Sequence, residues 1–165
     1  CRGQRVLNLF CYTGALSVAA AKGFARSVVS VDISKNYLTW AHRNFEKNGL
    51  SPKHYTFIRA NVLEWLETEP RPEFDVIILD PPTFSNTKST DRTLDIQRDH
   101  GALIGSCVGW LAPGGVIYFS NNFRGFSLDS LVQQSYLVKD ITRRSIDADF
   151  DRRPPHTLFK ISPKT

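Results

Sequence analysis

Three segments of the sequence end in residues that could help to bind a nucleoside. Residues 8–14 end in Gly14, the run 27–32 ends in Asp32, and the run 74–80 ends in Asp80 before two prolines. In an open α/β sheet, ligands sit beyond the carboxyl ends of the strands, where an acidic side chain after the second strand accepts both ribose hydroxyls. Asp32 lies 18 residues after Gly14, a spacing that suits this role. Because acidic residues often end strands for solubility, the combination carries the prediction, and Asp32 alone does not.

The first of these segments lacks the glycines of a phosphate cradle. A dinucleotide site needs several glycines so that backbone amides can approach a pyrophosphate. Here Gly14 stands alone, and Phe10, Cys11 and Tyr12 fill the turn. S-adenosylmethionine contains a nucleoside but no phosphate, so the sequence favours this cofactor over NAD.

The elements that would position these residues alternate between strands and helices, as βαβ units around a parallel sheet do. We predict strands at 5–10, 27–32, 55–59, 74–80 and 116–120, with helices at 13–22, 34–48, 62–67 and about 95–111. Residues 83–90 are predicted to form a polar loop and 112–115 a turn. A short helix at 128–134 and a hairpin of 137–143 with 156–161 would complete the sheet. This is the α/β architecture of the Rossmann-like class I methyltransferases: seven mostly parallel strands with a C-terminal antiparallel hairpin.

Composition narrows the class of protein. The 165 residues suit a single domain, and no apolar run is long enough to span a bilayer. Three cysteines without CxxC spacing argue against a disulfide framework or a zinc site and fit a reducing cytoplasm. The net charge of +5 suits a polyanion, although many basic proteins bind none. Because Cys1 leads straight into a strand, we expect a fragment of a longer chain, with RNA-binding segments elsewhere.

Five segments together resemble one family, the C-terminal half of the bifunctional bacterial 23S rRNA guanine methyltransferases. They are residues 8–14, 31–34, 80–88 (DPPTFSNTK), 97–100 and 120–122. DPPTFSN is the most specific of them, because DPP alone is common among methyltransferases. The resemblance implies methylation of guanine N7 in 23S rRNA or a ribosomal precursor. It also implies an upstream methyltransferase, which modifies an exocyclic amine, and an RNA-binding module.

The resemblance also assigns residues to the cofactor. Asp32 would bind the ribose, Asn61 the adenine, and Asp80 would lie at the methyl-transfer centre. Ile33 and Val62 are further candidate cofactor-binding residues. The methionine side would meet Asn8, Phe10, Tyr12, Thr13 and Gly14. Asn61 departs from the Asp that is usual there, but its carbonyl can accept the same hydrogen bond.

The expected chemistry is an in-line displacement that needs alignment and no metal. Asp80, Pro81 and Phe84 are the candidate catalytic residues. An ionised Asp80 only accepts hydrogen bonds, so it would hold the guanine N1 and N2 hydrogens or orient the loop. It could instead merely cap a strand end. Phe84 would stack on the extruded base. Candidate RNA contacts are Phe84, Lys88, Arg98, Asn121, Asn122 and Arg124, and we assign no role to His100 or His156.

Two alternatives remain open at this point. The first is a guanine N2 or cytosine C5 methyltransferase of the same fold. Carbon-5 chemistry needs a cysteine thiolate, but the DPPTF segment has none, Cys11 lies in the cofactor turn, and Cys107 falls inside a helix. Exocyclic-amine enzymes usually carry Asn-Pro-Pro-Tyr where this chain has Asp-Pro-Pro-Thr. The second alternative is a non-catalytic RNA-binding domain.

Overall fold

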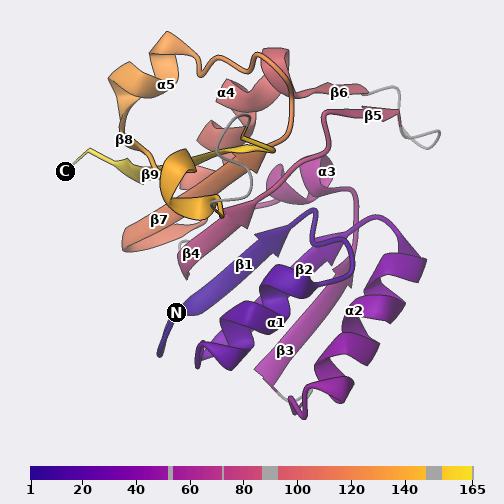
Figure 1. The fold of residues 1–165 in the computed structure, drawn as a ribbon. Helices are drawn as coiled ribbons and strands as arrows, with labels where there is room; N and C mark the ends of the chain where they lie inside the picture. The colour runs from indigo at the N-terminus through magenta and orange to yellow at the C-terminus, as the bar shows by residue number, and fades with distance from the viewer. Residues whose placement is uncertain (52–53, 72, 87–92, 148–153, 165) are drawn as a thin grey trace.

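A computed structural model describes residues 1–51, 54–71, 73–86, 93–147 and 154–164. Its main sheet has seven strands in the order β3-β2-β1-β4-β7-β9-β8 (Figure 1). The strands are β1 Arg5–Leu9, β2 Ser27–Asp32, β3 Tyr55–Arg59, β4 Phe74–Leu79, β7 Leu111–Asn121, β8 Tyr136–Asp140 and β9 Thr157–Pro163. Strand β9 alone runs antiparallel to its two neighbours, β7 and β8. The predicted fold class is confirmed.

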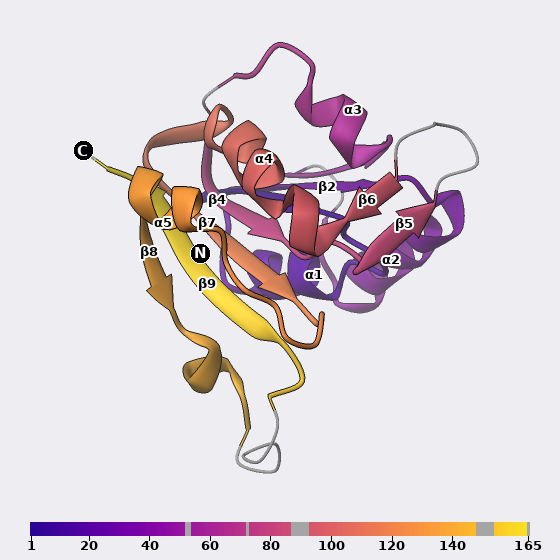
Figure 2. The same ribbon diagram turned by 90° about the horizontal axis from the view of Figure 1, so that it is seen from above.

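Helices cover both faces of this sheet (Figure 2). Helices α1 (Ala15–Lys22) and α2 (Lys35–Lys47) pack on one face, where Ala20 and Phe45 contact Val6, Val28 and Val76. The opposite face carries α3 Val62–Leu66, α4 Ile96–Val108 and α5 Ser130–Ser135 over a larger core. Strand β4 contributes to both cores, which explains its nearly continuous apolar sequence.

The chain changes faces between two neighbouring strands. Strand β1 lies between β2 and β4, and the chain passes from β1 to β2 through α1 on one face. From β4 it passes to β7 through α4 on the other face. A crevice forms at such a switch point, beyond the carboxyl ends of the strands. The segments after β1, β2, β4 and β7 therefore meet there.

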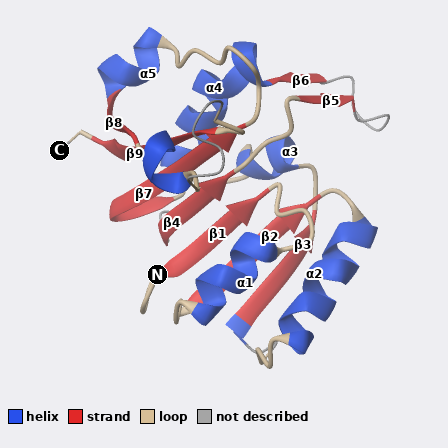
Figure 3. Cartoon of the chain, viewed as in Figure 1, coloured by secondary structure: helices blue, strands red, loops and turns tan. Residues whose placement is uncertain are grey.

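Two predicted elements were wrong. The predicted loop 83–90 contains β5 (Phe84–Asn86), which pairs antiparallel with β6 (Thr93–Asp95) in a hairpin beyond the main sheet (Figure 3). Such short polar strands have no hydrophobic period to reveal them. The predicted turn 112–115 lies within β7, as an irregularity opposite the β4 register shift between Phe74 and Val76. There a Cβ on Gly115 would lie 2.9 Å from the Phe74 carbonyl oxygen.

Across the described residues, the helices are all too short or too polar to cross a membrane.

Candidate active site

A cavity of about 960 Å³ opens at the switch point between β1 and β4. Many of the predicted site residues line it: Phe10, Tyr12, Asp32, Ile33, Asn61, Val62, Asp80, Pro81, Asn121 and Asn122. Others that the sequence analysis proposed lie outside its lining: Asn8, Thr13, Gly14, Phe84, Arg98 and Arg124. Lys88 falls outside the described residues. The cavity wall also includes residues that the sequence did not single out, among them Leu16, Tyr37 and Tyr118, and it includes Ser120, which the sequence analysis gave no role.

The turn after β1 is held in an unusual backbone conformation. Phe10 and Tyr12 have φ angles of 56° and 50°, and Gly14 has 75°. Positive φ is uncommon outside glycine, and it persists only where the surroundings enforce it. Here the Cys11 amide donates to the Val31 carbonyl, at 3.1 Å, and so holds the turn against β2. The turn brings Phe10 and Tyr12 to the cavity, as predicted.

Gly14 and Thr13 serve the packing of this turn. A Cβ on Gly14 would lie 2.7 Å from the Cβ of Ala41, so the glycine lets α2 approach α1 closely. The Thr13 carbonyl accepts a hydrogen bond from Asn44 Nδ2 at 2.9 Å. Both observations place these residues against α2, and their predicted place beside the methionine stays a prediction.

Asp32 is a well-fixed polar group of the cavity. It is 8% exposed, and its Oδ2 accepts from the Tyr12 amide at 2.9 Å while Oδ1 accepts from the Ser34 amide at 2.8 Å. Each carboxylate oxygen can accept a second hydrogen bond. Tyr37 stacks edge-on against Tyr12, with ring centroids 4.4 Å apart. This carboxylate is therefore oriented in advance for a pair of hydroxyl donors.

Asn8 lies beneath the turn. It is 1% exposed, and its Nδ2 donates to Ser17 Oγ at 2.8 Å. Ser17 in turn lies 2.8 Å from Ser30 Oγ, so three buried polar side chains join β1, α1 and β2. Asn8 therefore lies outside the cavity lining, within this network.

Asn61 caps α3. Its Oδ1 accepts from the Leu63 amide at 3.0 Å, and its Nδ2 lies 3.4 Å from Glu64 Oε1. Val62 is buried beside it, whereas Ile33 is 40% exposed on the cavity wall. Ile33 and Val62 supply apolar atoms and the Asn61 side chain supplies an amide group, a combination suited to a flat heteroaromatic ring.

Two hydrogen bonds join the segment after β4 to the end of β7. Ser120 Oγ donates to Asp80 Oδ1 at 2.5 Å, and Thr83 Oγ1 donates to Asn122 Oδ1 at 2.7 Å. Asn121 is 1% exposed and bonds to Thr157 Oγ1 and the Phe123 amide, which holds it in the fold. These contacts give the Asp80-Pro81-Pro82 segment a defined shape.

Phe84 lies outside the cavity lining. Its side chain is 61% exposed, and its ring meets Phe123 edge-on at 6.3 Å. The Thr83 carbonyl accepts from the Ile96 amide at 3.2 Å, which ties the start of the β5–β6 hairpin to α4. The hairpin therefore carries an exposed aromatic ring outside the cavity.

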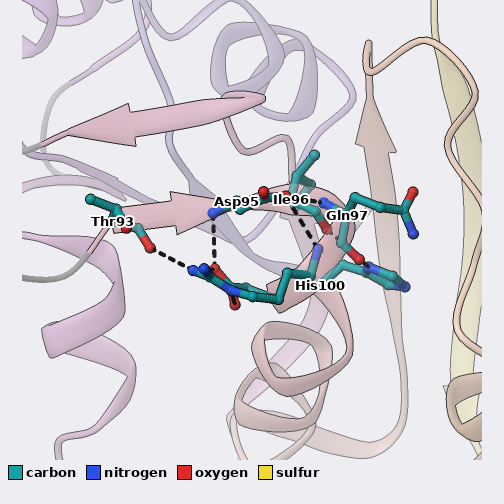
Figure 4. Close-up of polar contacts among 7 residues, drawn as sticks. Thr93, Asp95, Ile96, Gln97 and His100 are labelled. Atoms are coloured by element: carbon teal, nitrogen blue, oxygen red, sulfur yellow. Dashed lines mark hydrogen bonds and ion pairs between the residues drawn. The ribbon is translucent and has the colours of Figure 1, made fainter.

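The polar side chains of residues 97–100 lie in the first turn of α4 and form hydrogen bonds there (Figure 4). Asp95 caps the helix, and Arg98 donates to Asp99 at 2.6 Å and to the Thr93 carbonyl at 3.1 Å. This hydrogen-bonded ion pair lowers the pKa of Asp99 and raises that of Arg98. His100 is 2% exposed, bonds to the Ile96 carbonyl through Nδ1 and accepts from the Asp129 amide at Nε2. His100 therefore has a packing role.

The two buried cysteines are poor nucleophiles. Burial and the nearby Asp32 charge raise the pKa of Cys11 to about 12, and burial raises the pKa of Cys107 as well. The thiolate is the reactive form, so near neutral pH both side chains stay mainly in the less reactive thiol form. Within the described ranges, His, Cys, Asp and Glu form no cluster that could hold a metal ion.

Comparison with known proteins shows the family of the chain. Residues 1–153 match the model of the S-adenosylmethionine-dependent methyltransferase family. The chain belongs to this family. It is also similar to a crystal structure of a methyltransferase complexed with SAH, at 26% identity and a TM-score of 0.78, covering 97% of this chain and 45% of the other.

Curated relatives of this methyltransferase are considerably longer. The ribosomal RNA large subunit methyltransferase K/L of Hahella chejuensis is 56% identical over 91% of this chain and 21% of its own length. The ribosomal RNA large subunit methyltransferase K of Neisseria meningitidis serogroup B is 48% identical over 99% of this chain and 47% of its own. The chain therefore spans between about a fifth and half of these relatives.

The cavity fits the cofactor of the family. S-adenosylmethionine supplies a methyl group on a positively charged sulfur. The Asp32 carboxylate, preset by two amides, suits the ribose hydroxyls, and Ile33 and Val62 suit the adenine ring. Phe10, Tyr12 and Asp80 line the same cavity of the methyltransferase.

Proposed function

We propose that the protein transfers a methyl group to N7 of a guanine in 23S rRNA. The observation that carries the proposal is that Asp80, the first residue of the DPPTFSN segment, lines the same cavity as Asp32. The names of the relatives support an rRNA substrate. The choice of N7 rests on the DPPTFSN segment, on the poorly nucleophilic cysteines and on the resemblance drawn from the sequence.

The chemistry asks little of the protein beyond alignment. Guanine N7 carries an available lone pair, so no base has to remove a proton before attack. Asp80 accepts hydrogen bonds from the N1 and N2 hydrogens of the guanine, which presents the opposite edge, with N7, to the methyl group. Pro81 holds the backbone of Asp80 extended, and the exposed ring of Phe84 stacks on the base.

RNA binding extends beyond the cavity in this proposal. Asn122 on the cavity wall, together with Arg124 and Arg98 outside it, contributes contacts to RNA. Because the chain spans only part of its relatives, we also propose an upstream methyltransferase and RNA-binding module in the full protein. Phosphate contacts spread over such modules supply most of the affinity for RNA.

Chemical cleavage of rRNA tests the target atom. Methylation at N7 makes the glycosidic bond fragile, so borohydride followed by aniline cuts the chain there. Ribosomal RNA from a strain without the gene should lose one cut, and re-expression should restore it. Phe84→Ala should fail to restore the cut while still binding S-adenosylmethionine. A persisting cut, or a missing methyl that mass analysis places on N2 or on a cytosine, would disprove the N7 assignment.

A further inference from the structure

The partner of Asp80 is a serine on a different strand. Leu79 of β4 lies opposite Phe119 of β7 in the parallel pairing, so the next residues, Asp80 and Ser120, come side by side. Leu79 and Phe119 are fully buried in the core. Since strand side chains alternate between faces, Asp80 and Ser120 both point to the cavity, which both of them line.

The hydrogen bond between them restricts the carboxylate. Ser120 Oγ donates to Asp80 Oδ1 over 2.5 Å, within the range of a charge-assisted hydroxyl–carboxylate bond. Asp80 is exposed at a strand end and would otherwise rotate about its Cα–Cβ bond. The bond fixes the plane of the carboxylate and leaves Oδ2 to accept from other donors.

A second bond supports the same segment. Thr83 bonds to Asn122 two residues beyond Ser120, so the two bonds bracket Pro81 and Pro82. Proline has no amide hydrogen, so these residues cannot be held by amide donation to β7. Side-chain bonds from β7 take over that task.

We infer that Ser120 is a positioning residue for methyl transfer: its hydroxyl holds the Asp80 carboxylate in the orientation that receives the target base. The inference rests on the proposed function, because it requires Asp80 to contact the base. Ser120 has a role in this view only through Asp80. Its side chain does not touch the methyl group and donates no proton to the product.

The test is a set of variants in the purified protein, with protein-free 23S rRNA transcript and labelled S-adenosylmethionine under single-turnover conditions. Ser120→Ala should slow transfer by about tenfold or more, as loss of a hydrogen bond to a charged group implies. Cofactor affinity, measured by calorimetry, should change by less than about threefold in the same variant. Ser120→Thr keeps the hydroxyl and should restore transfer to within about threefold of the parent protein.

A double-mutant cycle shows whether Ser120 acts through Asp80. In an Asp80→Ala background, Ser120→Ala should cost less than about twofold, because no carboxylate remains to be held. Additive losses in the double variant, an unchanged rate in Ser120→Ala, or failure of Ser120→Thr to restore transfer would overturn the inference. If transfer in the Asp80→Ala background is too slow to measure, the rates of Ser120→Ala and Ser120→Thr test the inference by themselves. Total transferred label is counted wherever the methyl lands, so a product at N2 would refute the N7 proposal and leave this inference standing.

Discussion

The backbone amide of Tyr12 donates to Asp32 Oδ2 at 2.9 Å, which joins the turn after β1 to the acidic end of β2. Tyr12 has a positive φ of 50°. The hydrogen bond from its amide to the Asp32 carboxylate helps to stabilise this conformation. The Ser34 amide completes the arrangement on Oδ1. Asp32 thus shapes the turn, and we propose that it also receives the ribose.

Replacing Asp32 should weaken cofactor binding. Asp32→Ala removes a charged acceptor from the ribose and frees the Tyr12 amide, so affinity for S-adenosylmethionine and SAH should fall by at least about tenfold. Calorimetry measures this directly, and urea denaturation of the same variant separates loss of the site from loss of the fold. Unchanged affinity, or binding of NAD alone, would contradict the assignment.

Gly14 should tolerate no side chain. Gly14→Ala places a Cβ 2.7 Å from the Cβ of Ala41 at a φ of +75°, so the free energy of unfolding should fall by about 3 kcal/mol or more. Gly49 is the matched control, since its φ is +66° but no atom lies within 4 Å of its Cβ position. Gly49→Ala should cost only about 1–2 kcal/mol. Equal losses in urea denaturation would show that the contact with Ala41 is unimportant.

The buried thiols should be dispensable for transfer. Cys11→Ser and Cys107→Ala should retain methyl-transfer activity, apart from losses in stability. At pH 8, iodoacetamide should alkylate exposed Cys1 first, because the pKa of Cys11 is raised to about 12 and that of Cys107 is raised too. Peptide mass spectrometry measures the order of modification. A covalent protein–RNA adduct that depends on either buried thiol would refute this view and favour carbon-5 chemistry.

The ion pair of Arg5 and Asp75 should make stability depend on acid pH. Hydrogen bonds from the Arg5 side chain and amide lower the pKa of Asp75 below its ordinary 3.8. A lowered pKa in the folded state stabilises the protein above pH 3.8, and this contribution is lost as pH falls through that value toward the folded pKa. Asp75→Asn should therefore be destabilising at pH 7 and less so at pH 3.

Urea denaturation at the two pH values measures the effect of Asp75→Asn. The pair is partly exposed, so the effect should be small and screened by salt. In an Arg5→Gln background the pH dependence of Asp75→Asn should shrink. A difference that stays the same at pH 7 and pH 3 would show that the pair does not contribute.

The sheet and its ligand-binding end were predictable because both rest on patterns within the chain. Alternating apolar runs and helices specify a parallel sheet, and the spacing of Gly14 and Asp32 points to its carboxyl edge. The cavity brings Asp32 and Asp80 together as expected. These patterns can be recognised in a single sequence because each one involves residues that are close together in the chain.

The contacts that depend on pairing between distant segments were not predictable. Ser120 meets Asp80 through the β4–β7 register, which no local pattern encodes. Tyr37 reaches the cavity through the approach of α2 to the turn, and it contacts Tyr12 there. An asparagine in a strand gives no sign of whether it faces a ligand or a buried serine, so the location of Asn8 beneath the turn was missed.

The buried link between Asn8, Ser17 and Ser30 has a consequence for how the chain folds. Asn8 lies directly opposite Ser30 in the β1–β2 pairing, and Ser17 reaches both from α1. The apolar neighbours on β1 are nearly interchangeable, so they discriminate poorly between alignments of the two strands. A slip by one residue would turn Asn8 away from its partners. Each buried polar group left without a hydrogen bond would then destabilise the fold by about 1–3 kcal/mol. These three side chains therefore favour a single register between β1 and β2 and destabilise registers shifted by one residue.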